Sequence, residues 1–372
     1  MGSFLLTNYW LQLVWLFLGG TLLVILIPKR EEIVLGEKEL RWRPVAAILL
    51  IAPYIIWSGF RGNYYGDTGL YRSLFREAPS TFGQIGGYLN IINKDKGFTA
   101  LTAIIKVIIG NHPVIFFLII ATIQMLCIAL VYRRYSDDYW FSIFFFVAAT
   151  DYMSWMHNGT RQFLAVAIIF AATPLILKRK YIWVILIILF ASLFHLSALI
   201  MIPILFITAG DAWNWKLWIA ILLTVIVLIF INQFTSWLDY LLSDTQYANM
   251  VSDWTEWEDN GTNPIRVLVY AIPTILSILG RRWIIEADSP IINLSVGMSL
   301  ISTLIYIVSI FTSGIFIGRI PIYMSLYSTG ILLPWLLNNI FTDRSRSFVK
   351  VMAVVLFSLF FYYQMHFTWG LL

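Results

Sequence analysis

Three arginines are the first candidates for chemistry, because each stands beside a long apolar run. Arg61 follows one run in RGNYYGDTGLY, Arg161 begins another in NGTRQ, and Arg319 begins a third in GRIPIY. A guanidinium keeps its charge and forms paired hydrogen bonds with phosphate. Arg161 and Arg319 also stand at predicted helix N-termini, where the helix dipole favours an anion. These residues predict a site for a lipid-linked diphosphate; the alternative for each is a side chain that snorkels to lipid headgroups.

Two residues could act as the general base beside such an anion. His195 lies deep in an apolar context, and histidine exchanges protons near neutral pH. Asp67 lies in a tyrosine-rich loop between glycines, where its carboxylate could act as a base or position an arginine or a sugar hydroxyl. The alternatives are a helix–helix hydrogen bond for His195 and a turn-forming role for Asp67.

Further polar residues are candidates for contact with the substrate. Tyr323 follows Arg319 by one helical turn and is expected on the same helix face. Gln162 is the neighbour of Arg161, and Asp151 could supply another carboxylate.

The acidic segment 234–264 is rich in aromatic residues and contains neither Lys nor Arg. Its Trp254 and Trp257 could stack on sugar rings while nearby carboxylates accept hydrogen bonds from sugar hydroxyls. An interfacial aromatic belt is the alternative.

The elements that must position these residues are membrane helices. Of 372 residues, 60% are hydrophobic and 12% are charged, and the mean hydropathy is +0.80. A soluble domain carries about 25% charged residues. The apolar runs are too long and uniform for barrel strands. The sequence therefore predicts an all-α polytopic membrane protein with about 10–12 transmembrane helices in a single transmembrane domain, 1–372.

Basic residues in short loops set the expected orientation. Five segments carry clusters of Lys and Arg, at 28–43, 133–134, 178–180, 281–282 and 344–346. With these in the cytoplasm, 61–112 and 234–264 become external loops. The chain must cross the membrane an odd number of times between the cytoplasmic cluster 178–180 and the external loop at 234, and one span there is clear. Segment 181–208 must therefore cross an even number of times, as two short segments that turn near His195. The alternative is one long tilted helix. The ionisable candidates all fall on the outer side.

Metal and nucleotide chemistry have no support in the sequence motifs. There is no HExxH, DxD or cysteine pair, and the single cysteine, Cys127, lies in an apolar run. No P-loop or GxGxxG occurs. We expect no metal and no cofactor. The net charge of +5 is attributed to cytoplasmic loops, so no nucleic-acid partner is expected.

Several sequence blocks together resemble the EpsG family of Wzy-like polysaccharide polymerases. They are RGNYYGDTGLY at 61–71, KGF at 96–98, NGTRQFLAVAI at 158–168, LFASLFHLSALIMIP at 189–203 and GRIPIYMSLY at 318–327. The blocks occur in order over most of the chain. The block at 158–168 followed by the block at 189–203 is the most specific pair for the family.

The resemblance implies a multi-pass protein of the bacterial inner (plasma) membrane, with its active site facing the periplasm or exterior. Its substrates would be undecaprenyl-diphosphate-linked oligosaccharides for exopolysaccharide, capsule or O-antigen, with a flippase and a chain-length regulator as candidate partners. Arg61, Arg161 and Arg319 would hold the departing diphosphate, and His195 or Asp67 would act as the base. The scaffold would resemble multi-spanning GT-C-type glycosyltransferases.

Two alternatives remain open on the sequence. An O-antigen ligase would use the same lipid-diphosphate donor and is not separated by these blocks. A lipid-linked oligosaccharide flippase or transporter belongs to another class, for which repeated halves and broken helices around a midplane site are expected. The candidate residues here gather at one face and the chain shows no repeat, which favours an enzyme.

Overall fold

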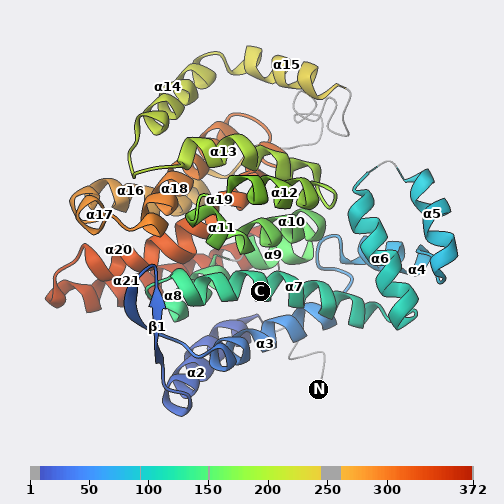
Figure 1. The fold of residues 1–372 in the computed structure, drawn as a ribbon, viewed down its shortest axis with the longest axis horizontal. Coiled ribbons are helices and arrows are strands. Elements are labelled where there is room, and N and C mark those ends of the chain that lie inside the picture. The colour runs from blue at the N-terminus through green and yellow to red at the C-terminus, as the bar shows by residue number, and fades with distance from the viewer. Residues whose placement is uncertain (1–8, 93, 150, 244–260, 371–372) are drawn as a thin grey trace. The chain divides into compact units, whose positions relative to one another are not determined.

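The computed structural model is helical almost throughout (Figure 1) and describes residues 9–92, 94–149, 151–243 and 261–370. Within these residues the strands are limited to β1 (Arg30–Val34) and β2 (Glu37–Arg41), which pair as one antiparallel hairpin. The chain forms two compact units, Met1–Leu199 with Asp343–Leu372 and Ile200–Thr342.

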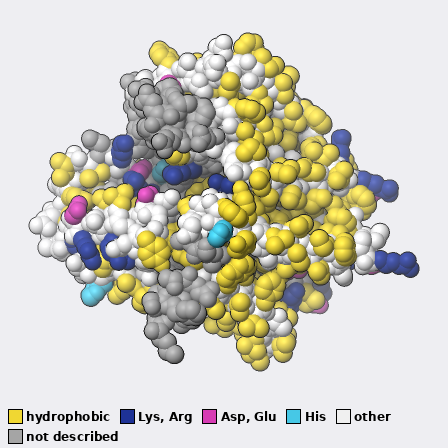
Figure 2. Space-filling view, turned by 180° about the vertical axis from the view of Figure 1, so that it is seen from behind, with side chains coloured by type: hydrophobic (Ala, Val, Ile, Leu, Met, Phe, Trp, Pro, Cys, Tyr) yellow, Lys and Arg dark blue, Asp and Glu magenta, His cyan; other side chains and the backbone are white. Residues whose placement is uncertain are grey.

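Hydrophobic side chains cover a broad area of the surface (Figure 2). Ile25 in α2 (Trp10–Leu26) is 71% exposed and Ile229 at the end of α14 (Trp215–Ile229) is 68% exposed. Apolar surface of this extent marks contact with lipid. The chain is therefore an all-α polytopic membrane protein, as its composition predicts.

The first unit is built around α7 (Pro113–Tyr135), which packs against α3 (Pro44–Phe60) and α10 (Thr160–Ala171). Both α3 and α7 begin with proline, whose fixed φ suits the first helical turn. The other helices of this unit are α2, α4 (Thr68–Glu77), α5 (Phe82–Ile91), α6 (Lys96–Ile109), α8 (Tyr139–Ala148), α9 (Asp151–His157), α11 (Thr173–Leu177), α12 (Tyr181–Ser192) and α21 (Asp343–Tyr363), which runs into a π-helical turn, Gln364–Thr368.

One end of this unit is held by charge pairs. Arg133, near the end of α7, donates to both carboxylate oxygens of Glu32 in β1, at 2.9 and 3.1 Å, and to the carbonyl of Trp42. The Arg133 guanidinium lowers the pKa of the Glu32 carboxyl to about 2, so the pair stays charged at any ordinary pH. Arg41 in β2 donates to the Ser136 carbonyl. Two of the basic clusters, 28–43 and 133–134, therefore lie at the same end of the unit, as the topology prediction requires.

The second unit is rich in buried hydroxyl groups. Thr274 of α16 bonds to Ser299 and Thr303 of α18 at 2.8 and 2.7 Å, and Ser299 bonds onward to Ser328. Such bonds join helices where the surroundings are apolar. The helical segments of this unit are α13 (Met201–Thr208), α14, α15 (Ile231–Leu242), α16 (Pro264–Leu279), α17 (Arg281–Ala287), α18 (Pro290–Ile310), a 3₁₀ turn (Ile317–Arg319), α19 (Ile322–Tyr327), a π-helical turn (Ser328–Leu332) and α20 (Leu333–Asn339).

Helix length gives fewer spans than the predicted 10–12. Within the described residues, four continuous helices of 21–26 residues are long and apolar enough to cross a membrane, and two bent pairs, α14 with α15 and α16 with α17, raise the total to six. The difference arises because several apolar runs are short or interrupted: α2 and α3 have 17 residues each, and one run divides into α10 and α11 at Ala172. A hydropathy profile detects an apolar run but does not show where the helix within it breaks.

The stretch 181–208 is not one continuous helix. Helix α12 ends at Ser192, residues 193–195 are non-helical, and a 3₁₀ segment, Leu196–Ile200, leads into α13. The break at His195 excludes one continuous helix, and the two short membrane crossings stay a prediction.

The predicted external loop 61–112 contains three helices, α4, α5 and α6. Lys106, the one charged residue in the interior of α6, is 6% exposed and donates to the carbonyls of Arg76 and Ala78. It thereby satisfies carbonyl groups at the C-terminal end of α4. Lys106 therefore has a structural role, which explains a lysine within an apolar run.

Candidate functional site

Arg61 lies at the end of the first unit opposite the charge-paired hairpin. Its guanidinium carbon lies 3.9 Å from the centre of the Phe117 ring. Phe117 and Arg133 stand near opposite ends of α7, separated by about 24 Å of helix. The polar groups around Arg61 therefore occupy the far end of the unit from the basic clusters.

The side chain of Arg61 is only 7% exposed. It donates from Nη1 to the Ser58 carbonyl at 2.7 Å and from Nε to Thr68 Oγ1 at 3.0 Å. It thus links the end of α3 to the start of α4, while its buried Nη2 has no hydrogen-bond partner among the described residues. Arg72 donates to the Arg61 carbonyl at 3.3 Å, which adds a second cation to this corner.

The loop that carries Asp67 meets the block that carries Arg161. The Asp67 amide donates to Asn158 Oδ1 at 3.0 Å, and Asp67 itself is exposed. Gly66 has φ +51°, and a Cβ there would lie 2.8 Å from the Asn158 side chain. The approach requires glycine both for its conformation and for its size.

The start of α6 meets the end of α12 in the same way. The Gly97 amide donates to the Leu193 carbonyl at 2.8 Å, and a Cβ on Gly97 would lie 2.7 Å from that oxygen. Arg161, in the first turn of α10, pairs with Asp95 at 2.8 Å, just before α6. Four of the sequence blocks, at 61–71, 96–98, 158–168 and 189–203, therefore converge at this end.

His195 is half-buried beside this junction. Its Nδ1 is 2.7 Å from Ser197 Oγ, which accepts a hydrogen bond from Gln162 Nε2 at 3.4 Å. If Nδ1–H donates to Ser197, the lone pair needed by a general base is on Nε2. The chain Gln162–Ser197–His195 fixes the ring relative to the start of α10.

Two other polar residues lie behind the surface. His157 is buried, with Nε2 2.8 Å from Ser58 Oγ and its ring edge-on to Tyr65 at 4.8 Å. Asp151 is 2% exposed and accepts a hydrogen bond from Gln364 Nε2 at 3.4 Å. These contacts give Asp151 a packing role in this conformation, and its predicted contact with substrate stays a prediction.

Arg319 and Tyr323 belong to the second unit. Arg319 ends a 3₁₀ turn and is half-buried, whereas α19 begins only at Ile322. The two residues lie in different segments of one apolar helical stretch, Ile317–Asn339, and their predicted common helix face stays a prediction. Tyr323 is 2% exposed. The predicted sugar-binding residues Trp254 and Trp257 lie outside the described residues.

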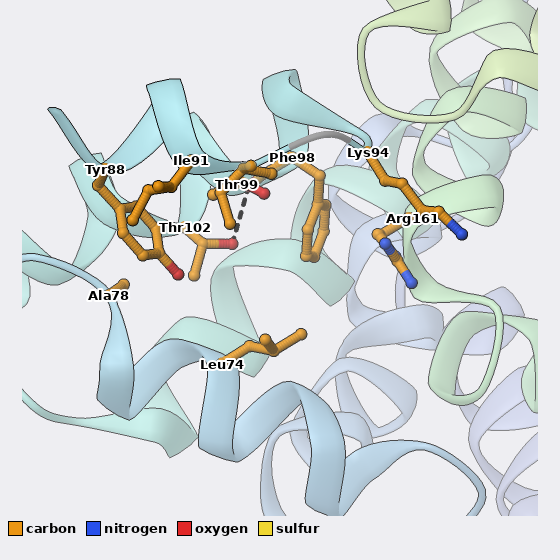
Figure 3. A pocket seen from close by; sticks show the side chains of 10 residues that line it. Leu74, Ala78, Tyr88, Ile91, Lys94, Phe98, Thr99, Thr102 and Arg161 are labelled. Atoms are coloured by element: carbon orange, nitrogen blue, oxygen red, sulfur yellow. Dashed lines mark hydrogen bonds between the residues drawn. The ribbon is translucent and has the colours of Figure 1, made fainter. Parts of the chain in front are cut away.

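A cavity of about 350 Å³ adjoins Arg161 in the first unit (Figure 3). The lining comes from α4 and α5 with the residue after each, from α6 and from α10. Its members are Leu74, Ala78, Tyr88, Ile91, Ile92, Phe98, Thr99, Thr102 and Arg161, with Lys94 from the segment before α6. Lys94 and Arg161 lie side by side at one end, and the apolar residues fill the other. In the described part of the chain no three His, Cys, Asp or Glu side chains are placed to hold a metal ion.

Sequence reasoning missed Lys94, Asp95, Arg72 and Ser197. The signal for the first two was present, since Lys94-Asp95-Lys96 directly precedes the Gly97-Phe98 pair. Arg72 follows the TGLY sequence at once. Ser197 carries no local signal beyond its position two residues after His195.

The family comparison covers most of the chain. No curated protein and no solved structure is similar enough to this chain to count as a match. The model of the EpsG family matches residues 45–369, from the first turn of α3 to the last described turn of the chain. This match includes each of the blocks that converge at the far end of the first unit. The chain therefore belongs to the EpsG family, a family of Wzy-like polysaccharide polymerases.

Proposed function

We propose that this protein polymerises polysaccharide repeat units by glycosyl transfer at the outer face of the bacterial inner membrane. The donor is a chain linked to undecaprenyl diphosphate, and the acceptor is a lipid-linked repeat unit. The observation that carries the proposal is the convergence of Arg161, Lys94 and His195 at the end of the unit opposite its basic clusters. The positive-inside rule assigns that end to the outside.

In the transfer, an acceptor hydroxyl oxygen forms a bond to the anomeric carbon of the donor. The bond from that carbon to the diphosphate oxygen breaks, and its electron pair leaves with the diphosphate. Arg161 and Lys94 stabilise the negative charge that develops on the leaving group. Arg61 has a structural role beside this site, because its buried guanidinium holds the end of α3 against the start of α4.

The proton of the attacking hydroxyl passes to a base. His195 is the first candidate, because Ser197 Oγ lies 2.7 Å from its Nδ1 and orients the ring. In the tautomer with Nδ1–H, Nε2 is the nitrogen that takes the proton. Asp67 is the second candidate, because its carboxylate is exposed in the loop beside Asn158. Neither role requires a metal or a nucleotide.

The test is single replacement in a cell that makes the glycan. Arg161→Ala, His195→Gln, Asp67→Asn and Arg319→Ala are compared with Arg282→Ala, an exposed arginine paired with Glu286 in α17. We expect Arg161→Ala to lower polymer by roughly a hundredfold, the scale for loss of a group that stabilises developing charge. Lipid-linked single repeats should accumulate while protein abundance is normal. Undiminished polymer in all four variants, as in Arg282→Ala, would contradict the proposal.

A further inference from the structure

The cavity beside Arg161 has a cationic end and an apolar end. Figure 3 shows Lys94 and Arg161 side by side, with the Phe98 ring between them and the rest of the cavity. Beyond Phe98 the walls are Leu74 of α4, Ala78 just after it and Ile91 of α5, together with Tyr88 and Thr102. A ligand that matches this arrangement has an anion at one end and a hydrocarbon chain attached directly to it.

The hydroxyl groups in the cavity do not suit a sugar. A sugar ring needs several hydrogen-bond partners, because burying its hydroxyls without them is costly. Thr102 Oγ1 already donates its hydrogen to the Phe98 carbonyl at 2.8 Å. Leu74, Ala78, Ile91 and Ile92 offer no side-chain partners, so Tyr88 and Thr99 carry the other hydroxyl groups in a mainly apolar lining. The lining therefore favours hydrocarbon.

The size of the cavity limits how much of a ligand it holds. A volume of about 350 Å³ is at the lower end of the usual range for ligand pockets, roughly 300–1,000 Å³. A long polyprenyl chain would enter only with the part next to its anion. The remainder would stay in the bilayer, where it is equally well solvated.

We propose that this cavity binds the isoprenoid segment next to the diphosphate of the lipid-linked substrate, with the phosphates at Lys94 and Arg161. The assignment rests on the proposed function, which supplies a polyprenyl diphosphate as substrate. It adds that α4, α5 and α6 form the element that recognises the lipid. Recognition of this segment would place the anomeric carbon at a fixed distance from the apolar end, whatever sugar is attached.

Binding of two probes to the purified full chain tests the assignment. Farnesyl diphosphate presents both the anion and a prenyl tail, and inorganic diphosphate presents the anion alone. Leu74→Asn and Ile91→Asn place a polar group in opposite walls, and Phe82→Asn changes an exposed residue of α5 outside the cavity. Ile91 is 75% exposed and Phe82 64%, so both variants of α5 are expected to fold.

We expect both cavity variants to lower the preference for farnesyl over inorganic diphosphate by about tenfold, and Phe82→Asn to leave it unchanged. Binding of inorganic diphosphate should be unaffected by these three changes, whereas Arg161→Ala should weaken both probes. An unchanged preference in both cavity variants would overturn the assignment. So would an equal loss in Phe82→Asn.

The proposed function can fail separately from this assignment. If the probes behave as expected but the reconstituted chain does not extend lipid-linked repeats, the polymerase proposal is wrong and the lipid site remains. If the chain extends repeats while the cavity variants keep the wild-type preference, the lipid tail binds elsewhere.

Discussion

His195 can work as a base only if its ring is held with the correct nitrogen toward the substrate. Ser197 Oγ lies 2.7 Å from Nδ1 and is itself held by Gln162. A hydroxyl can donate or accept, so this contact fixes the orientation of the ring, and the role of base requires the tautomer in which Nδ1–H donates to Ser197. In the proposed reaction Ser197 would position His195, and Gln162 connects Ser197 to the helix turn that carries Arg161.

The role of Ser197 predicts a specific kinetic effect. Ser197→Ala removes the partner of His195 Nδ1 and should lower kcat by about tenfold, the scale of one hydrogen bond, with little change in KM. Ser197→Thr keeps the hydroxyl and should restore most of the rate. Ser192→Ala, which removes an exposed hydroxyl bonded only within α12, is the control. Equal kcat values for Ser197→Ala and wild type would remove His195 from the role of base.

At the scale of elements, the contact between α6 and α12 depends on the absence of a side chain at Gly97. A Cβ there would lie 2.7–2.8 Å from backbone and side-chain atoms of Leu193. Backbone atoms cannot rotate away, so the two helices would have to separate. The same contact places Asp95 against Arg161 and His195 near the start of α10.

Gly97→Ala should therefore destabilise the protein by about 1–3 kcal/mol, the usual cost of overpacking. Gly86→Ala is the matched control, since Gly86 lies in the neighbouring helix α5 and a Cβ there meets nothing within 4 Å. Thermal unfolding of the two purified variants is the measurement. Gly97→Ala should unfold at a lower temperature than wild type, and Gly86→Ala should not. Equal midpoints would show that the junction tolerates a methyl group.

The elements were predictable from the sequence where composition decides them. Long apolar runs without charge become helices, and proline marks where α3 and α7 begin. The breaks were predicted unevenly. Parity placed a turn near His195, whereas the break at Ala172 was missed although Pro174 follows it two residues later. The Arg161–Asp95 pair lies 66 residues apart in sequence, and no periodic pattern connects its members. Such pairs follow from tertiary packing alone.

At the scale of the whole molecule, the described charges divide the first unit into two ends. One end carries the hairpin with Glu32 and Arg133, where the charges serve structure. The other carries Arg61, the Arg161–Asp95 pair and the cavity. The topology prediction implied this division. It placed the basic loops on the cytoplasmic side, and the number of crossings between them placed the candidate residues on the other side. The prediction placed Arg319 with the same site, and that placement stays a prediction.

Transfer of glycan from a lipid diphosphate by this chain is the proposed activity, and reconstitution measures it directly. The purified protein in lipid vesicles is given undecaprenyl-diphosphate-linked repeat units, without nucleotide sugar, and the products are separated by length. We expect a ladder of lipid-linked chains longer than one repeat, with free undecaprenyl diphosphate released for each transfer, and no ladder from Arg161→Ala. Repeats that stay single with the wild-type protein, or a ladder that the Arg161→Ala protein makes equally well, would contradict the account.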